Sequence, residues 1–270
     1  MKLLRKEFKK LSILVLLISF ITSCSSTRLI YTLAGEFIQD EISYFLDLDK
    51  EEKILLNNQV KEMIAWHRKN MLPRYGTYLT KIANNLKEDK YNNADIEKVL
   101  KDGLYLTEET VFGFTPYASK FLLQLEINEA IKFMEKKMEK RQKERILELS
   151  KPFDIKYKKR KEKLKSNFTR FFGDLDNAQI ILIEEYAYIT LDDSRIRLKN
   201  RAKRQKVFLE FLKTKPNNLE LTVFLNRLLL KGHEITNPDY QAFSEISLER
   251  FQKLLGNMLS TSSTKQRENI

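Results

Sequence analysis

The 270-residue chain contains little cysteine, histidine, glycine or proline. One cysteine cannot form an internal disulfide or a cysteine-rich zinc or iron–sulfur site, so both classes of framework are excluded. Two histidines leave little material for a histidine-based catalytic or metal site. No glycine-rich phosphate loop, nucleophile-elbow or zinc-protease motif occurs in the sequence. We therefore predict no catalytic residues, no metal and no cofactor.

The composition argues against a wholly disordered chain, because 42% of the residues are hydrophobic and 11% are aromatic. The chain has 49 basic and 37 acidic residues, a formal charge of +12. Such an excess favours an anionic neighbour but does not specify a fold. We therefore look for the partner among anionic surfaces.

The first 23 residues have the pattern of an export signal. Basic residues in positions 1–10 precede the apolar run 11–21, which would span roughly 16 Å as a helix, about half of a ~30 Å hydrocarbon core. The run ends at Thr22-Ser23-Cys24, which resembles the lipobox of bacterial lipoproteins. The resemblance implies a signal peptide over residues 1–23 and a lipid on the Cys24 thiol. An ordinary secretory signal or a short uncleaved anchor is the alternative.

The lipobox resemblance also implies an address. Residues 24–28 would form a lipidated tether, and the several acyl chains of a lipoprotein give stable anchoring. In lipoproteins of Gram-negative bacteria an aspartate after the cysteine favours the inner membrane, whereas this chain has Ser25. The expected location is the outer membrane, facing the periplasm.

The remaining chain has the periodicity of helices and no alternating strand pattern. We predict an all-α fold, a single multi-helix domain of about eight or nine helices over residues 29–259, followed by a disordered tail at 260–270. Capping boxes at Asp49 and Asp176 mark two helix starts. Gly113 and Pro116 indicate the end of a helix whose N-cap is expected at Asn93.

Two groups of polar residues offer alternatives for chemistry. His67 lies on an apolar helix face, where a hydrogen-bonded core histidine is the expected role, and His233 lies at a helix end. The acidic residues between Asp40 and Glu52 include enough carboxylates for a glycan-cleaving pair. An envelope enzyme acting on peptidoglycan is therefore one alternative function.

Lysine and arginine are concentrated between residues 132 and 165. For an exported protein the available polyanions are anionic lipids and lipopolysaccharide, whereas nucleic acid is in another compartment. A solvated helix face is the alternative, and a second basic cluster at 195–206 would extend the patch if the helices are neighbours. The candidate residues for binding an anionic surface are Lys136, Lys137, Lys140, Arg141, Lys156, Lys158, Lys159, Arg160 and Lys161.

Two short motifs carry a family resemblance. With the lipobox, Trp66-His67-Arg68 followed by Leu72-Pro73-Arg74-Tyr75 resembles an uncharacterised family of Gram-negative bacterial lipoproteins, domain of unknown function 6279. The chain departs from the pattern at Lys50-Glu51-Glu52 and in its lysine-rich middle. The family has no established activity, so the resemblance implies fold and address only. We expect Trp66, His67, Arg68, Pro73, Arg74 and Tyr75 to serve packing first.

These observations favour a non-enzymatic interaction or envelope-maintenance module that is tethered to the membrane by lipid. Its expected partners are the membrane and an anionic lipid or an envelope protein. Binding of anionic lipid or lipopolysaccharide through the basic helices is the first alternative, and the envelope enzyme is the second.

Overall fold

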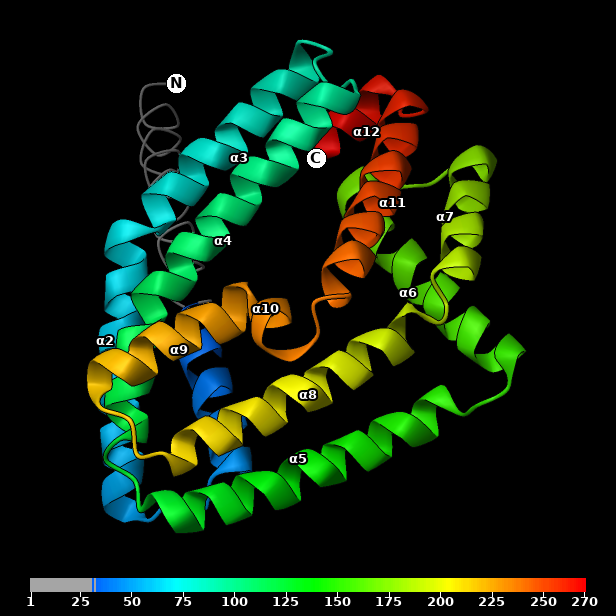
Figure 1. Cartoon of the computed structure of the whole chain (residues 1–270). Coiled ribbons are helices and arrows are strands. Elements are labelled where there is room, and N and C mark those ends of the chain that lie inside the picture. Colours follow the sequence, from blue (N-terminus) through cyan, green and yellow to red (C-terminus); the bar gives the residue numbers. More distant parts are fainter. Residues whose placement is uncertain (1–30, 32) are drawn as a thin grey trace, which may run out of the picture.

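All regular elements are α-helices in the computed structural model, which describes residue 31 and residues 33–270 (Figure 1). The signal segment and the tether, with Cys24 and Ser25, lie outside the described residues. A helix that ends at residue 45 comes first. The others are α2 (Lys50–Asn70), α3 (Leu72–Lys87), α4 (Asn93–Leu122), α5 (Ile127–Leu149), α6 (Phe153–Phe172), α7 (Asn177–Ile189), α8 (Asp193–Lys213), α9 (Asn218–Leu230), α10 (Gly232–Thr236), α11 (Tyr240–Ser260) and α12 (Thr264–Asn269). The predicted all-α class is confirmed, with more helices than the eight or nine expected. None of these helices is long and apolar enough to cross a membrane.

Local capping chemistry places several helix ends where the sequence predicts them. The Asp49 side chain accepts a hydrogen bond from the Glu52 N–H at 2.8 Å, and the Glu52 carboxylate accepts one from the Asp49 N–H at 2.9 Å. Asp176 and Gln179 form the same box at the start of α7. These bonds satisfy N–H groups that have no partner inside the helix. Gly173, at φ 77°, ends α6 in a conformation that favours glycine.

The predicted end of the helix at Gly113 and Pro116 is wrong. Helix α4 continues through both residues to Leu122, and its N-cap is Asn92 rather than Asn93. An internal proline costs about 3 kcal/mol, and packing against α9 offsets that cost. The buried Thr115 hydroxyl donates to Asn226 Oδ1 at 2.7 Å, and the Ser119 hydroxyl donates to the Asn218 carbonyl at 3.1 Å.

The buried side chains form two separate hydrophobic cores. The first lies between α2, α5, α8, α9 and the C-terminal end of α4, and the second lies between α3, α6, α7, α11 and the N-terminal end of α4. Phe121 and Ile96, near the two ends of α4, belong to different cores. The 30 residues of α4 span about 45 Å at 1.5 Å per residue. Helix α4 therefore connects the two cores.

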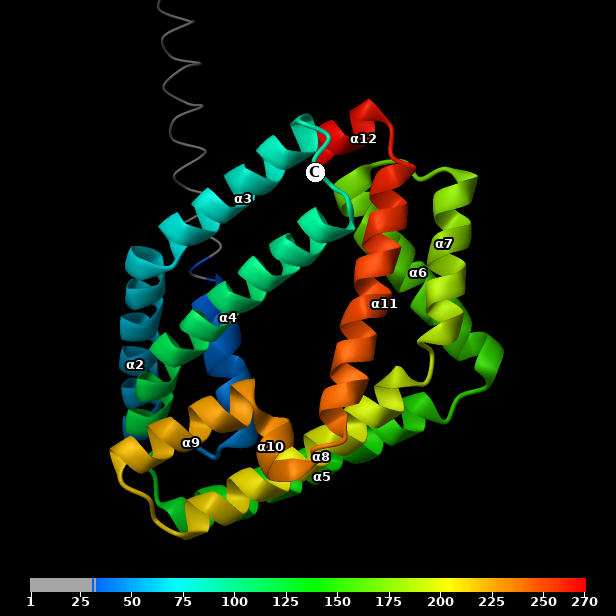
Figure 2. The ribbon, with the colours of Figure 1, turned by 45° about the horizontal axis from the view of Figure 1, so that its top comes forward.

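Pairs of packed helices form the sides of a frame (Figures 1 and 2). Helix α5 packs along α8, α6 along α7 and α3 along α4, while α11 contacts both α4 and α7. The chain turns sharply between α5 and α6, so these two helices diverge (Figure 2). Helix α8, which carries the second basic cluster, packs beside α5, so the condition for the two clusters to be neighbours is met for α5.

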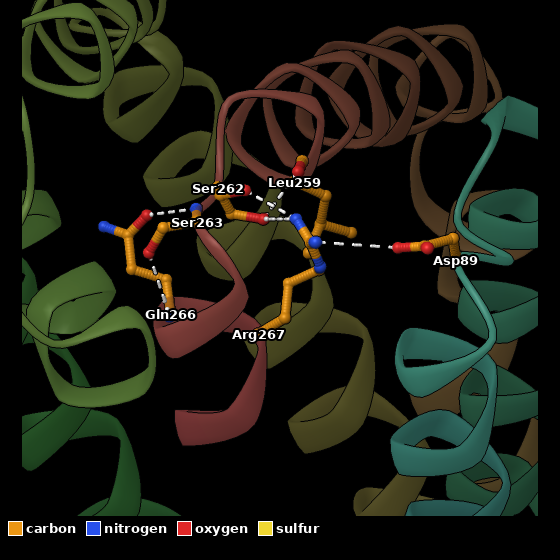
Figure 3. A network of polar contacts seen from close by, with 6 residues as sticks. All are labelled: Asp89, Leu259, Ser262, Ser263, Gln266 and Arg267. Atoms are coloured by element: carbon orange, nitrogen blue, oxygen red, sulfur yellow. Dashed lines mark hydrogen bonds and ion pairs between the residues drawn. The ribbon is translucent and has the colours of Figure 1, made fainter.

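The C-terminal segment is ordered, so the expected disordered tail at 260–270 is wrong. It forms α12, whose start is a capping box between Ser263 and Gln266. Figure 3 shows Arg267 reaching the Ser262 carbonyl at 2.5 Å and Asp89, in the loop between α3 and α4, at 3.6 Å. The polar composition suggested disorder, but the partners of this segment lie far away in the sequence.

Two buried glutamines attach α12 to α7. Gln179 and Gln266 are each the third residue of a helix, and each closes its own capping box. Their amides also exchange hydrogen bonds at 2.9 and 3.1 Å, and Gln266 Nε2 donates to the Asp174 carbonyl at 2.6 Å. The two helix starts are therefore held side by side by one amide pair.

We expect Gln266→Ala to lower the free energy of unfolding by about 1–3 kcal/mol, because it leaves the buried Gln179 amide without its partner. The matched control is Lys265→Ala, one residue earlier on the exposed side of α12. Urea denaturation measures both variants. Equal stability of the two variants would show that the amide pair does not hold the C-terminus.

Candidate functional site

The family-motif residues meet at the junction where α2 turns into α3. Trp66, His67 and Arg68 lie in the last turns of α2, and Pro73 lies in the first turn of α3. There the missing N–H of proline costs no helical hydrogen bond. Met71, between the two helices, is almost fully buried. The turn thus directs both halves of the motif toward α4.

Trp66 packs directly on the backbone of α4 at Gly113. A Cβ atom on Gly113 would lie 1.8 Å from the indole ring, so only glycine allows this approach. The indole also meets the Phe114 ring edge-on, with centroids 5.9 Å apart. Gly113 is therefore a packing position inside a helix, whereas the sequence suggested a stop.

His67 is enclosed by aromatic rings. Its Nδ1 lies 2.8 Å from the Tyr31 hydroxyl, and its ring stacks on Tyr75 with centroids 5.7 Å apart. Burial lowers the pKa of His67, which favours the neutral imidazole near pH 7. Arg68 lies over the Tyr31 ring at 5.4 Å. The partners of His67 agree with the expected hydrogen-bonded core histidine.

Arg74 and Tyr75 complete the junction from α3. The Arg74 guanidinium pairs with Glu109 of α4 at 2.5 Å. The Tyr75 hydroxyl lies 2.9 Å from Thr110 Oγ1 and 3.4 Å from the Leu106 carbonyl. Together the motif contacts residues 106–114, the middle of α4. Within the described chain no group of three metal-ligating side chains occurs here or elsewhere.

Some of the predicted basic residues have partners within the protein, and others form no ion pair with described residues. Arg141 makes a bidentate pair with Glu41 at 2.8 and 3.1 Å, and Lys137 lies over the Tyr44 ring. The half-buried Arg160 donates to the Thr190 hydroxyl. Two further lysines have carboxylate partners: Lys159 pairs with Glu148, and Lys161 pairs with Glu184. The others, which form no ion pair with described residues, are Lys136, Lys140, Lys156 and Lys158.

The nine residues do not form one continuous patch. Four lie on α5, which packs along α8, and five lie on α6, which packs along α7 and diverges from α5 (Figure 1). Glu148, at the end of α5, binds both Lys151 and Lys159, and these hydrogen bonds lower its pKa to about 2. Three of the nine candidate residues, Arg141, Lys159 and Lys161, therefore have their charge paired locally.

An exposed apolar tip, which the sequence analysis missed, lies where α5 turns into α6. Phe153, Tyr157 and Tyr188 contact one another with ring centroids 5.8 to 6.3 Å apart. Phe153 and Tyr188 are 53% and 62% exposed, and Leu147, in the last turn of α5, is 70% exposed. We call these four residues the corner tip. Its only sequence signal is apolar residues beside lysines at two helix ends, and the contribution of α7 depends on the fold.

We expect Gly113→Ala to lower the free energy of unfolding by about 1–3 kcal/mol, because the new methyl group would collide with Trp66. Gly76→Ala is the control, since Gly76 is an exposed helix position with no atom within 4 Å of an added Cβ. That substitution should raise stability by up to about 1 kcal/mol through helix propensity. Thermal and urea denaturation measure both.

In a Trp66→Leu background the penalty of Gly113→Ala should shrink, because the two residues are coupled. If Gly113→Ala stabilised the protein as Gly76→Ala does, the close packing of Trp66 on α4 would be contradicted.

Comparison with known proteins assigns a family to this architecture. No curated protein and no solved structure matched the chain. The model of a family of unknown function (DUF6279) matches residues 44–241. The matched segment contains the whole α2–α3 junction and extends to the start of α11. The chain therefore belongs to the family of unknown function DUF6279.

Proposed function

We propose that this protein is a lipid-anchored, non-enzymatic interaction module of the Gram-negative envelope, held on the periplasmic side of the outer membrane. The anchor rests on the basic start, the short apolar run and Cys24 in the lipobox pattern. Ser25 supports sorting to the outer membrane. The lipid keeps the helical domain near the membrane, where envelope proteins are the available partners.

The observation that carries the non-enzymatic part is that the motif side chains are engaged with one another and with α4. His67 meets a tyrosine hydroxyl rather than a carboxylate, and Arg74 is paired with Glu109. Three of the six carboxylates considered for glycan cleavage also have structural partners, since Asp49 and Glu52 form a capping box and Glu41 binds Arg141. These contacts favour a structural role, in which the motif residues connect helices, over a role as a catalytic acid–base pair.

We expect the expressed protein to begin at Cys24, to carry the mass of attached lipid and to fractionate with the outer membrane. Cys24→Ala should abolish both the lipid mass and the membrane association. Ser25→Asp is a sorting control that should keep the lipid but shift the protein to the inner membrane. Intact-mass analysis and membrane fractionation measure these outcomes. A soluble mature protein with a free thiol would overturn the anchor.

A second candidate function, contact with an anionic membrane surface, is favoured by the corner tip. Exposed aromatic and aliphatic side chains insert at the headgroup boundary, and each nearby lysine contributes about 1 kcal/mol on an anionic surface. Lys156 is one helical turn from Phe153, and Lys158 is exposed. The corner tip therefore limits the proposed basic surface to the residues next to it, Lys156 and Lys158.

The chain from residue 24 onward with Cys24→Ser, which retains every described helix, should bind vesicles containing phosphatidylglycerol. We expect binding to weaken as salt is added, because exposed charges are screened, and to weaken several-fold in a Phe153→Ser, Tyr188→Ser variant. Leu219→Ser is the control, since Leu219 is 73% exposed on α9 outside the tip. Vesicle co-sedimentation measures all three. Equal binding to pure phosphatidylcholine vesicles would reject this function.

A further inference from the structure

A groove of about 510 Å³ lies between α8, α9 and the start of α11. Ligand pockets commonly have volumes of about 300–1,000 Å³. We call it the arginine groove, because three arginines of α8 line it and no aspartate or glutamate does. Its lining residues are Arg197, Asn200, Arg201, Arg204, Gln205, Phe208, Leu225, Leu228, Leu229 and Tyr240.

The three groove arginines form no short ion pair, although Glu144 and Glu148 line a neighbouring pocket that Arg201 also borders. Arg204 is half-buried and donates to the Leu228 and Leu229 carbonyls at the end of α9, at 2.5 and 3.3 Å. Burial and the nearby charge of Arg201 lower the pKa of Arg204. Arg201 makes no ion pair with any described residue, while Arg197 has one long contact of 3.9 Å with Asp193. A bound anion would relieve this excess of positive charge.

The start of α10 lies close against the Arg204 side chain. A Cβ on Gly232 would lie 2.8 Å from Arg204 Nε and 3.2 Å from Cζ. Glycine therefore allows the guanidinium to lie against the start of α10. Arginine has five N–H donors, and the hydrogen bonds of Arg204 to described residues use only Nη2. Because Arg204 lines the groove, a donor that these bonds leave unused can bind a phosphate there.

Asn200 provides an independent sign of a missing partner. Its side chain is 5% exposed, it lines the groove, and its Oδ1 has no hydrogen-bond donor. A buried acceptor without a donor carries an energetic cost of about 1–3 kcal/mol. This oxygen is itself covered, so a ligand in the groove would reach it only if the Asn200 side chain moved.

The opposite side of the groove is apolar. Leu225 and Leu228 are buried, and Leu229 is 50% exposed at the edge. Phe208 lies on the same helix as the arginines, one helical turn beyond Arg204. An anionic head placed at the arginines would have an apolar surface beside it for a hydrocarbon chain.

We propose that the arginine groove binds a phosphate-headed, single-chain amphiphile, the chemistry of a lysophosphatidylglycerol. The arginines would hold the phosphate, and the leucines would cover the chain. This inference does not depend on the lipid anchor or on the corner tip, because the groove lies on other residues.

Calorimetric titration of the chain from residue 24 onward, with Cys24→Ser, tests the proposal. The probe is a lysophosphatidylglycerol with a short acyl chain, below its critical micelle concentration. We expect saturable binding at one site, at least tenfold tighter than for lysophosphatidylcholine of the same chain length. Glycerol phosphate, which lacks the chain, should bind at least tenfold more weakly. Equal affinity for the lysophosphatidylcholine or for a fatty acid of the same length would overturn the assignment of the head.

Two exposed positions allow variants that leave the cores intact. Arg201→Gln should weaken binding about tenfold, which corresponds to about 1.4 kcal/mol, whereas Lys199→Gln on the same helix should not. Leu229→Glu should abolish binding by placing a carboxylate at the groove, whereas Val223→Glu, on α9 outside the groove, should not. Phe153→Ser should leave binding unchanged, which separates the groove from the corner tip. Binding that survives both groove variants would overturn the proposal.

Discussion

The architecture depends on α4 being one uninterrupted helix. Its ends are buried in different hydrophobic cores, so a break near the middle would leave the two cores without this connection. Pro116 removes one helical hydrogen bond within that span. Small buried side chains, Thr115 and Ser119, compensate by letting α9 approach and by bonding to it. The contacts of α4 with α2, α3, α9 and α11 then determine where the surrounding helices lie.

The family motif packs on the middle of α4, between the two ends that are buried in the cores. Trp66 covers the glycine at position 113, and Tyr75 reaches Thr110 and the Leu106 carbonyl. A motif with a tryptophan, a histidine and two arginines resembles a catalytic signature when read as letters alone. Its contacts instead place Trp66, Arg74 and Tyr75 in the packing of α2 and α3 against α4.

Features that depend on neighbouring residues were predictable, and features that depend on distant contacts were not. The capping boxes at Asp49 and Asp176 and the glycine end of α6 are local, and the structure has them where the sequence indicates. The continuation of α4 past Pro116 depends on Asn226, over a hundred residues away. The order of α12 depends on Gln179, although Ser263 and Gln266 already had the spacing of a capping box. The packing of the motif against α4 was likewise not predictable, because it depends on tertiary contacts.

The distribution of charge shows why a count of basic residues is a poor guide to a binding surface. The longest basic stretch, on α5 and α6, is partly neutralised by Glu41, Glu148 and Glu184. Helix α8 is also basic, yet three of its arginines line a groove that has no lining carboxylate. An uncompensated charge beside an apolar wall gains more from an anion than a paired charge in water, because pairing and screening have already reduced the attraction of the latter. The lack of a carboxylate in the lining of the groove is thus more informative than the abundance of lysine elsewhere.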